Sequence, residues 1–180
     1  WGVNIVADES YGPKDTDMTP QLTNLRANAD IQAILNPGFG QGPSIVTRNY
    51  HQLGVKTPFY QSHGVASAEF IKLAGAQAAE GVRMPSPALM VGDLLAADDP
   101  QKKPVDDYRG LYEKATGQPV SSFGGYAYDA TMLLVDALGR AKSMKPADIR
   151  DAIEATKNHV GATGAYTMSP TDHLGLDLSA

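Results

Sequence analysis

The first half of the sequence alternates short apolar runs with segments whose apolar residues recur at helical spacing. This alternation is typical of an α/β fold with a parallel sheet and helices on both faces. In such sheets ligands bind in the loops at the carboxyl ends of the strands. The pattern predicts strands at residues 3–7, 31–35, 58–61 and 82–84, with helices at residues 15–29, 43–53 and 66–74 between them.

The pattern changes after Pro85. Residues 88–104 are rich in Asp, Lys and Pro and predict an exposed connection, so we expect two structural units. Helical spacing returns beyond this connection, and the last apolar run precedes a turn. The expected elements are helices at residues 105–116, 126–141 and 146–156 and a strand at residues 163–168.

The composition is that of a soluble globular protein, with 42% hydrophobic and 19% charged residues. A net charge of −5 argues against a nucleic-acid or anionic-membrane partner, because both require clustered Lys and Arg. Cysteine is absent, which excludes disulfides and thiolate metal sites. No signal peptide is visible at a start that resembles a core strand, so we expect that preceding residues are missing.

A glycine-rich loop at residues 36–42 raises the question of a phosphate site. Its glycines have G-x-G-x-G spacing, whereas the dinucleotide motif needs G-x-G-x-x-G and a later acidic residue. Residues 31–68 contain no Asp or Glu, and Pro43 follows where a phosphate loop has lysine. The loop is therefore interpreted as a tight turn or pocket rim with little negative potential, in which Phe39 either packs or binds.

The residues give no defensible catalytic or metal-binding set. The four histidines are too dispersed for metal-ligand spacing. Ser62 and His63 are adjacent in an extended segment, so their side chains point to opposite sides and cannot form a nucleophile–base pair. We expect no enzyme activity, no metal and no cofactor.

Five stretches, spread over nearly the whole chain, occur in a specific order. They read VNIVADESYG, ILNPGFGQGPSIVTRNYHQLG, PFYQSHGVASAEFIKLAGAQAAEGV, FGGYAYDATMLLVDALGRA and GATGAYTMSPTDHLG. Together they resemble the branched-chain amino-acid (leucine, isoleucine, valine) type periplasmic substrate-binding proteins of ABC transporters. The resemblance implies two α/β lobes with ligand between them, of which this chain is about half. Residues 1–88 would form the second lobe, 89–117 the hinge crossing and connecting helix, and 118–180 an incomplete part of the first lobe.

The resemblance also implies ligand contacts on the second lobe. Tyr11 matches a tyrosine that closes over the ligand, and Phe39, or Gly38, matches an aromatic wall. His63 lies where amino-acid binders carry an acidic residue that pairs with the ligand's ammonium, so we expect a small carboxylate without an amine, such as an aromatic acid, with an amino acid as the alternative ligand. The alternative is that His63 only caps its own loop. The expected binding set is Ser10, Tyr11, Gly38, Phe39, Ser62 and His63.

The function implied by the resemblance is the solute-binding component of an ABC importer, periplasmic or extracellular and membrane-anchored, with a membrane permease as partner. Two alternatives stay open: a ligand-sensing receptor or regulator of the same fold, and, less favoured, an α/β enzyme. The helix expected at residues 126–141 carries Leu134, Val135 and Leu138. We expect the missing half of the first lobe or a neighbouring chain to cover them.

Overall fold

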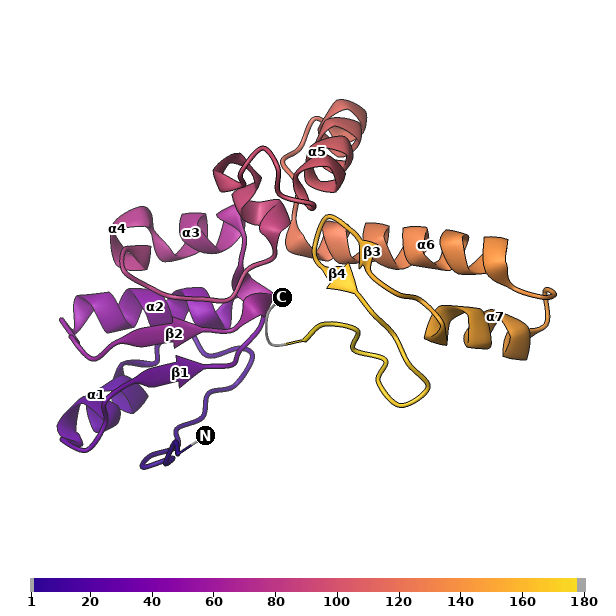
Figure 1. The fold of residues 1–180 in the computed structure, drawn as a ribbon. Coiled ribbons are helices and arrows are strands. Elements are labelled where there is room, and N and C mark those ends of the chain that lie inside the picture. The colour runs from indigo at the N-terminus through magenta and orange to yellow at the C-terminus, as the bar shows by residue number, and fades with distance from the viewer. Residues whose placement is uncertain (1, 178–180) are drawn as a thin grey trace. The chain divides into compact units, whose positions relative to one another are not determined.

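The computed structural model describes residues 2–177, and the chain divides after Pro85 into two compact units (Figure 1). No helix within the described residues is both long and apolar enough to cross a membrane.

The first unit is built on a parallel pair of strands, β1 (Ile34–Asn36) and β2 (Phe59–Gln61). Arg83 extends the sheet by a parallel bridge to Tyr60. Ile34 and Phe59 are buried while Leu35 is 68% exposed, so one face of the pair is packed. The parallel α/β architecture expected from the sequence is confirmed.

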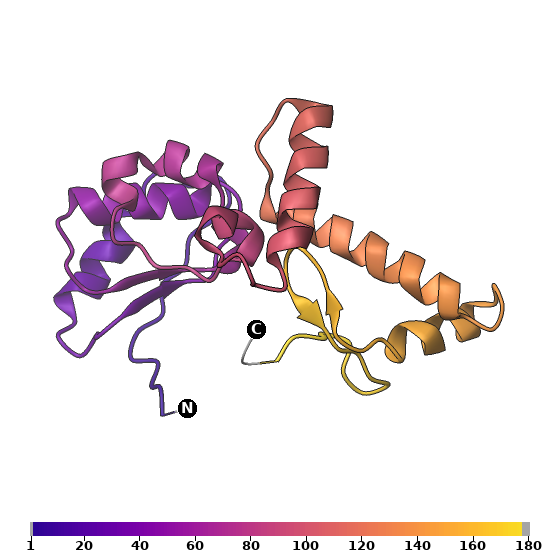
Figure 2. The ribbon, with the colours of Figure 1, turned by 45° about the horizontal axis from the view of Figure 1, so that its top comes forward.

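Helices pack on that buried face, and Figures 1 and 2 both show α2 and α3 running along the strands. Met18, Leu22 and Val46 join Ile34 and Phe59 in the core. The first helix begins later than predicted because its first turn is set by a proline, which is favoured at a helix start. The helices are α1 (Thr19–Ala27), α2 (Gly42–Gln52), α3 (Ala68–Ala74) and α4 (Ala76–Ala79).

The strand predicted at residues 3–7 is wrong for this structure. Val3 and Ile5 are 82% and 87% exposed, and the segment belongs to no strand. An extended segment becomes a strand only when its backbone groups pair with a neighbour, and within residues 2–177 it has none. A short apolar, partly β-branched run is therefore not sufficient here to form a strand.

The second unit is mainly helical, and its three predicted helices are confirmed with earlier starts for the first two. The predicted exposed connection at residues 88–104 is partly wrong, because Leu89 is only 1% exposed and packs with Val105 and Tyr108. A short antiparallel hairpin replaces the single strand expected at residues 163–168. The elements are η2 (Ala88–Leu94), α5 (Lys102–Thr116), α6 (Ser122–Arg140), α7 (Pro146–Glu154), β3 (His159–Val160) and β4 (Ala165–Tyr166).

A buried carboxyl group ties α6 to the hairpin loop of the second unit. Asp129 is 2% exposed and accepts hydrogen bonds from the backbone N–H groups of Ala162 (2.8 Å) and Thr163 (2.7 Å). The Thr163 hydroxyl bonds to the same carboxyl group. A Cβ atom on Gly161 would lie 2.5 Å from the carboxyl carbon, so the loop approaches this closely only with glycine there.

The side of α6 opposite Asp129 carries apolar residues that are exposed to solvent. Leu134 and Val135 are 40% and 55% exposed, and Leu138 is half-buried. The surface expected to cover them stays a prediction.

Candidate ligand-binding site

The loops that follow β1 and β2 are held together at the carboxyl ends of the two strands. The Ser62 N–H donates to the Asn36 carbonyl (3.1 Å), and the Ser62 hydroxyl donates to the Gly38 carbonyl (2.9 Å). The same hydroxyl oxygen accepts from the Gly64 N–H, which caps the short turn that follows. Ser62 thus positions both loops, and a ligand contact by it stays a prediction.

Tyr11 lies against the glycine-rich loop from the other side. Its hydroxyl donates to Asn36 Oδ1 over 3.0 Å. A Cβ atom on Gly38 would lie 2.2 Å from the Tyr11 hydroxyl oxygen, and one on Gly42 would lie 2.6 Å from the Tyr11 ring. Two of the three glycines therefore make room for this tyrosine, a role that the spacing alone does not reveal.

Phe39 and His63 meet across the two loops. Their rings are 6.0 Å apart between centroids, in an edge-to-face arrangement that aromatic rings favour. A Cβ atom on Gly64 would lie 2.2 Å from the Phe39 ring. Phe39 still exposes 62% of its surface, so it both packs on the neighbouring loop and offers a free aromatic face.

His63 is exposed, and its imidazole makes no hydrogen bond within the described residues. The side chain that caps the turn is Ser62, so the alternative that the His63 side chain caps its own loop is not what the structure shows. A free imidazole at the mouth of two strand-end loops can donate or accept a hydrogen bond.

A cavity of about 450 Å³ opens beside β1 and the glycine-rich loop. This volume is within the range of small-molecule pockets, about 300–1,000 Å³. Ser10, Tyr11, Gly38 and Phe39 of the expected binding set line it, whereas Ser62 and His63 do not. Its apolar wall comes from core residues of α1, β1 and α2.

Three polar residues of this cavity, Glu9, Gln21 and Asn36, were missed by the sequence reasoning. Asn36 is buried at the end of β1, and an amide that closes an apolar run was the available signal. Glu9 lines the cavity from the segment before Tyr11, with its Oε1 accepting from Asn24 Nδ2 (3.1 Å). The loops after β1 and β2 lack acidic residues as noted, but the cavity itself contains a carboxylate.

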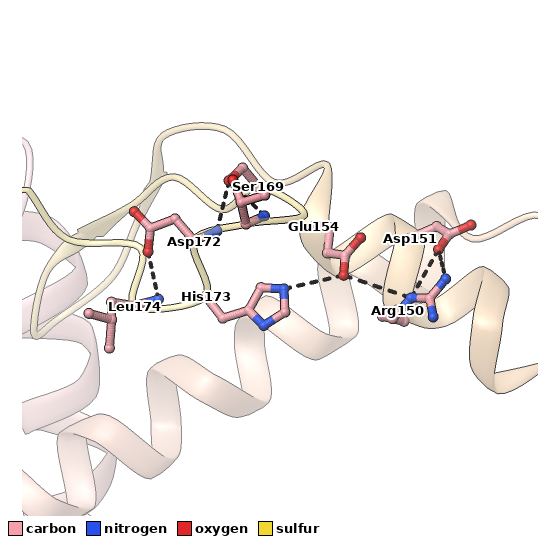
Figure 3. A network of polar contacts seen from close by, with 8 residues as sticks. Arg150, Asp151, Glu154, Ser169, Asp172, His173 and Leu174 are labelled. Atoms are coloured by element: carbon pink, nitrogen blue, oxygen red, sulfur yellow. Dashed lines mark hydrogen bonds and ion pairs between the residues drawn. The ribbon is translucent and has the colours of Figure 1, made fainter.

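One histidine of the second unit, His173, has a side-chain partner on α7 (Figure 3). His173 Nε2 lies 3.2 Å from Glu154 Oε1, and the same oxygen lies 3.7 Å from Arg150 Nε. Arg150 also contacts Asp151 at 2.7 Å. These contacts link the turn after β4 to α7. Within residues 2–177 no group of three or more His, Asp or Glu side chains is arranged to hold a metal ion.

Comparison with known proteins places the chain in a family. The model of the periplasmic binding protein family matches residues 1–176. A protein of Rhodopseudomonas palustris strain CGA009 is similar, with 33% identity and a TM-score of 0.85, over 98% of this chain and 51% of that one. An extracellular ligand-binding receptor of Rhodopseudomonas palustris HaA2 has 30% identity and a TM-score of 0.87, over 98% and 50%. A comparison with curated proteins finds no match.

A more distant structure is a branched-chain amino acid transporter substrate-binding protein of Streptococcus pneumoniae in complex with isoleucine. It has 25% identity and a TM-score of 0.72, over 92% of this chain and 45% of that one. The chain thus spans about half the length of the structures that it matches. The expectation of a binding protein rather than an enzyme agrees with these matches. The chain belongs to the periplasmic binding protein family.

Proposed function

We propose that this chain is part of an extracytoplasmic solute-binding protein that delivers a small carboxylate to an ABC permease. The observation that carries the proposal is the meeting of Phe39 and His63, on the loops after β1 and β2, with Tyr11 packed against the first of these loops from the segment before α1. Tyr11 and Phe39 supply aromatic surface, and His63 supplies a free polar group. Apolar walls with few polar anchors are typical of small-molecule sites.

The carboxylate preference rests on His63. An imidazole beside an aromatic ring can donate a hydrogen bond or carry a positive charge, and both favour an anionic group. Where related amino-acid binders carry an acidic residue for the ligand's ammonium, this chain offers no such partner at the loop. The ligand proposed is therefore a carboxylate without an amine, with an aromatic or branched apolar body.

An amino acid is the second candidate ligand, and Glu9 favours it. Its carboxylate lines the cavity and would attract an ammonium group, and a similar protein is known in complex with isoleucine. In that arrangement the ammonium would be held from the segment before Tyr11 instead of from the loop after β2.

The two ligands are separated by calorimetric titration of the complete two-lobed protein. The sharpest pair is leucine and 4-methylpentanoate, which differ only by the amine, with benzoate as an aromatic probe. The proposal expects tighter binding of the amine-free acid and a reversed preference in His63→Glu. His51→Glu is the matched control, because His51 is exposed on α2 and should leave the preference unchanged. Preferential binding of leucine by the unaltered protein would contradict the proposal.

The transport role needs its own test, because a receptor of the same fold would bind the same ligand. A periplasmic or extracellular location and a permease partner are expected for an importer component. In proteoliposomes holding the cognate permease, the ligand-loaded protein should raise ATP hydrolysis severalfold over the ligand-free protein. Ligand binding without any effect on the permease would favour the receptor.

A further inference from the structure

The direction of one hydrogen bond decides what Tyr11 can offer a ligand. Asn36 Oδ1 accepts from the Gly38 N–H and lies 3.0 Å from the Tyr11 hydroxyl oxygen. A backbone N–H can only donate, so the amide atom that it reaches must be the oxygen, which fixes the orientation of the Asn36 side chain. The Tyr11 hydroxyl must then be the donor toward Asn36.

This arrangement uses the single hydrogen of the Tyr11 hydroxyl. What remains on that oxygen is a lone pair, so toward any further partner Tyr11 can only accept a hydrogen bond. Asn36 Oδ1 already accepts two hydrogen bonds, so the group of this side chain that stays without a partner among the described residues is Nδ2, a buried donor.

Tyr11 is also held in place. The positions that Cβ atoms would take on Gly38 and Gly42 are filled by its hydroxyl and its ring, so the tyrosine sits wedged on the loop. A side chain packed this closely does not turn its hydroxyl toward another acceptor without moving the loop.

The other ionisable group on the cavity also accepts. Glu9 contributes a carboxylate, and no Lys, Arg or His is among the described residues that line the cavity. Tyr11 and Glu9 thus line the cavity as acceptors without a cationic donor beside them. Because an acceptor left unpaired on binding loses its water without replacement, a ligand group that donates to Tyr11 is favoured there over one that can only accept.

We propose that Tyr11 is a specificity-determining residue that selects ligands carrying a hydrogen-bond donor, such as a hydroxyl, at the end that enters this cavity. The inference rests on the proposed function and deepens it: the ligand's carboxylate is held outside this cavity, and a donor at its other end meets the Tyr11 oxygen.

The test uses calorimetric titration of the complete protein with acids that differ at one position. The probes are benzoate, 3- and 4-hydroxybenzoate, and the corresponding methoxybenzoates, which keep the oxygen and lose the donor. A hydroxybenzoate should bind about five- to tenfold tighter than benzoate, as one hydrogen bond allows. The methoxy acids should gain nothing. Tyr11→Phe should abolish the advantage, whereas Tyr50→Phe should keep it, because the Tyr50 hydroxyl donates to the Thr57 carbonyl instead.

Equal binding of the hydroxy and methoxy acids, or an advantage that survives in Tyr11→Phe, would overturn the inference and leave the proposed function standing. If leucine binds better than 4-methylpentanoate and Tyr11→Phe removes that difference, the donor is the amine. The inference then holds, while the amine-free ligand class falls.

A ligand-independent measurement covers the case in which none of these acids binds. Tyr11→Phe should lower the urea midpoint in the unaltered background and have no effect in an Asn36→Leu background, because the bond is already lost there. Equal shifts of the urea midpoint in both backgrounds would show that the Tyr11 and Asn36 side chains are not coupled. That result would overturn the inference.

Discussion

Replacing Asp129 by alanine should destabilise the second unit more than any surface substitution. The change removes the acceptor for the N–H groups of Ala162 and Thr163, which are 0% and 6% exposed. Each buried donor left without a partner costs about 1–3 kcal/mol. Allowing for partial relaxation, the expected loss of unfolding free energy is about 2–5 kcal/mol. Asp129→Asn keeps one acceptor oxygen and should lose about half as much.

The matched control is Asp136→Asn on the same helix. Asp136 is 49% exposed and pairs with Arg140 at 2.8 Å, and exposed ion pairs of this kind contribute under about 1 kcal/mol. Urea unfolding followed by circular dichroism gives the free energies. Hydrogen exchange gives the local result: the amides of Ala162 and Thr163 should lose protection in Asp129→Ala and keep it in Asp136→Asn.

If Asp129→Ala lost no more stability than Asp136→Asn, and the two loop amides kept their protection, the carboxyl group would not be the partner that holds the loop. Water or the Tyr166 hydroxyl, which bonds to Thr163 over 2.6 Å, would then have to satisfy those amides.

Three further predictions test other parts of the chain. Gly64→Ala should displace the Phe39 ring, whose atoms lie 2.2 Å from the added Cβ, and weaken ligand binding by the complete protein about three- to tenfold in calorimetry. Burial raises the pKa of the Tyr166 hydroxyl. The contribution of this group to the free energy of unfolding is therefore complete below the ordinary tyrosine pKa of about 10 and is lost as the pH rises through the raised value. Urea unfolding at pH 8 and pH 10.5 should show a smaller loss for Tyr166→Phe than for the unaltered chain. Ser67→Ala removes the cap of α3 and should cost about 0.5–2 kcal/mol in the same assay, with an unchanged midpoint refuting the cap.

The features predicted best were those that a few neighbouring residues determine. The helix at residues 43–53 was found within one residue at each end, because a proline starts it and Gly54 ends it. Gly54 adopts a φ of 63°, a left-handed conformation that glycine takes without strain. Helix ends of this kind are local signals, and the sequence shows them directly.

The strand at residues 3–7 failed for the opposite reason. Its apolar, partly β-branched run is a local signal, but a strand forms only when two segments pair. The same limit hid Leu89, whose burial depends on Val105 and Tyr108 from the following helix. The composition of residues 88–104 predicts an exposed segment, but packing buries Leu89.

The candidate site was also predicted only in part. Tyr11, Phe39 and His63 were chosen by resemblance, and the structure gathers them on neighbouring loops, although their contact with a ligand stays a prediction. Asn36 could not be found in this way, because its role is a bond to a side chain 25 positions earlier in the chain. The direction of that hydrogen bond, which leaves the Tyr11 hydroxyl oxygen as an acceptor, can be read only from the three-dimensional structure.

The three glycines of the loop after β1 show that a glycine-rich sequence does not identify a phosphate site unless the geometry of the loop is known. A phosphate loop uses glycines so that backbone N–H groups can approach an anion. Here Gly40 provides a left-handed turn at a φ of 72°, while Gly38 and Gly42 leave the space that Tyr11 fills. The Gly38 N–H is already donated to Asn36 Oδ1. A loop whose space and whose first amide are both taken by its own protein has no cradle for a phosphate. The same glycines instead set an aromatic hydroxyl, with its lone pair free, at the edge of a cavity.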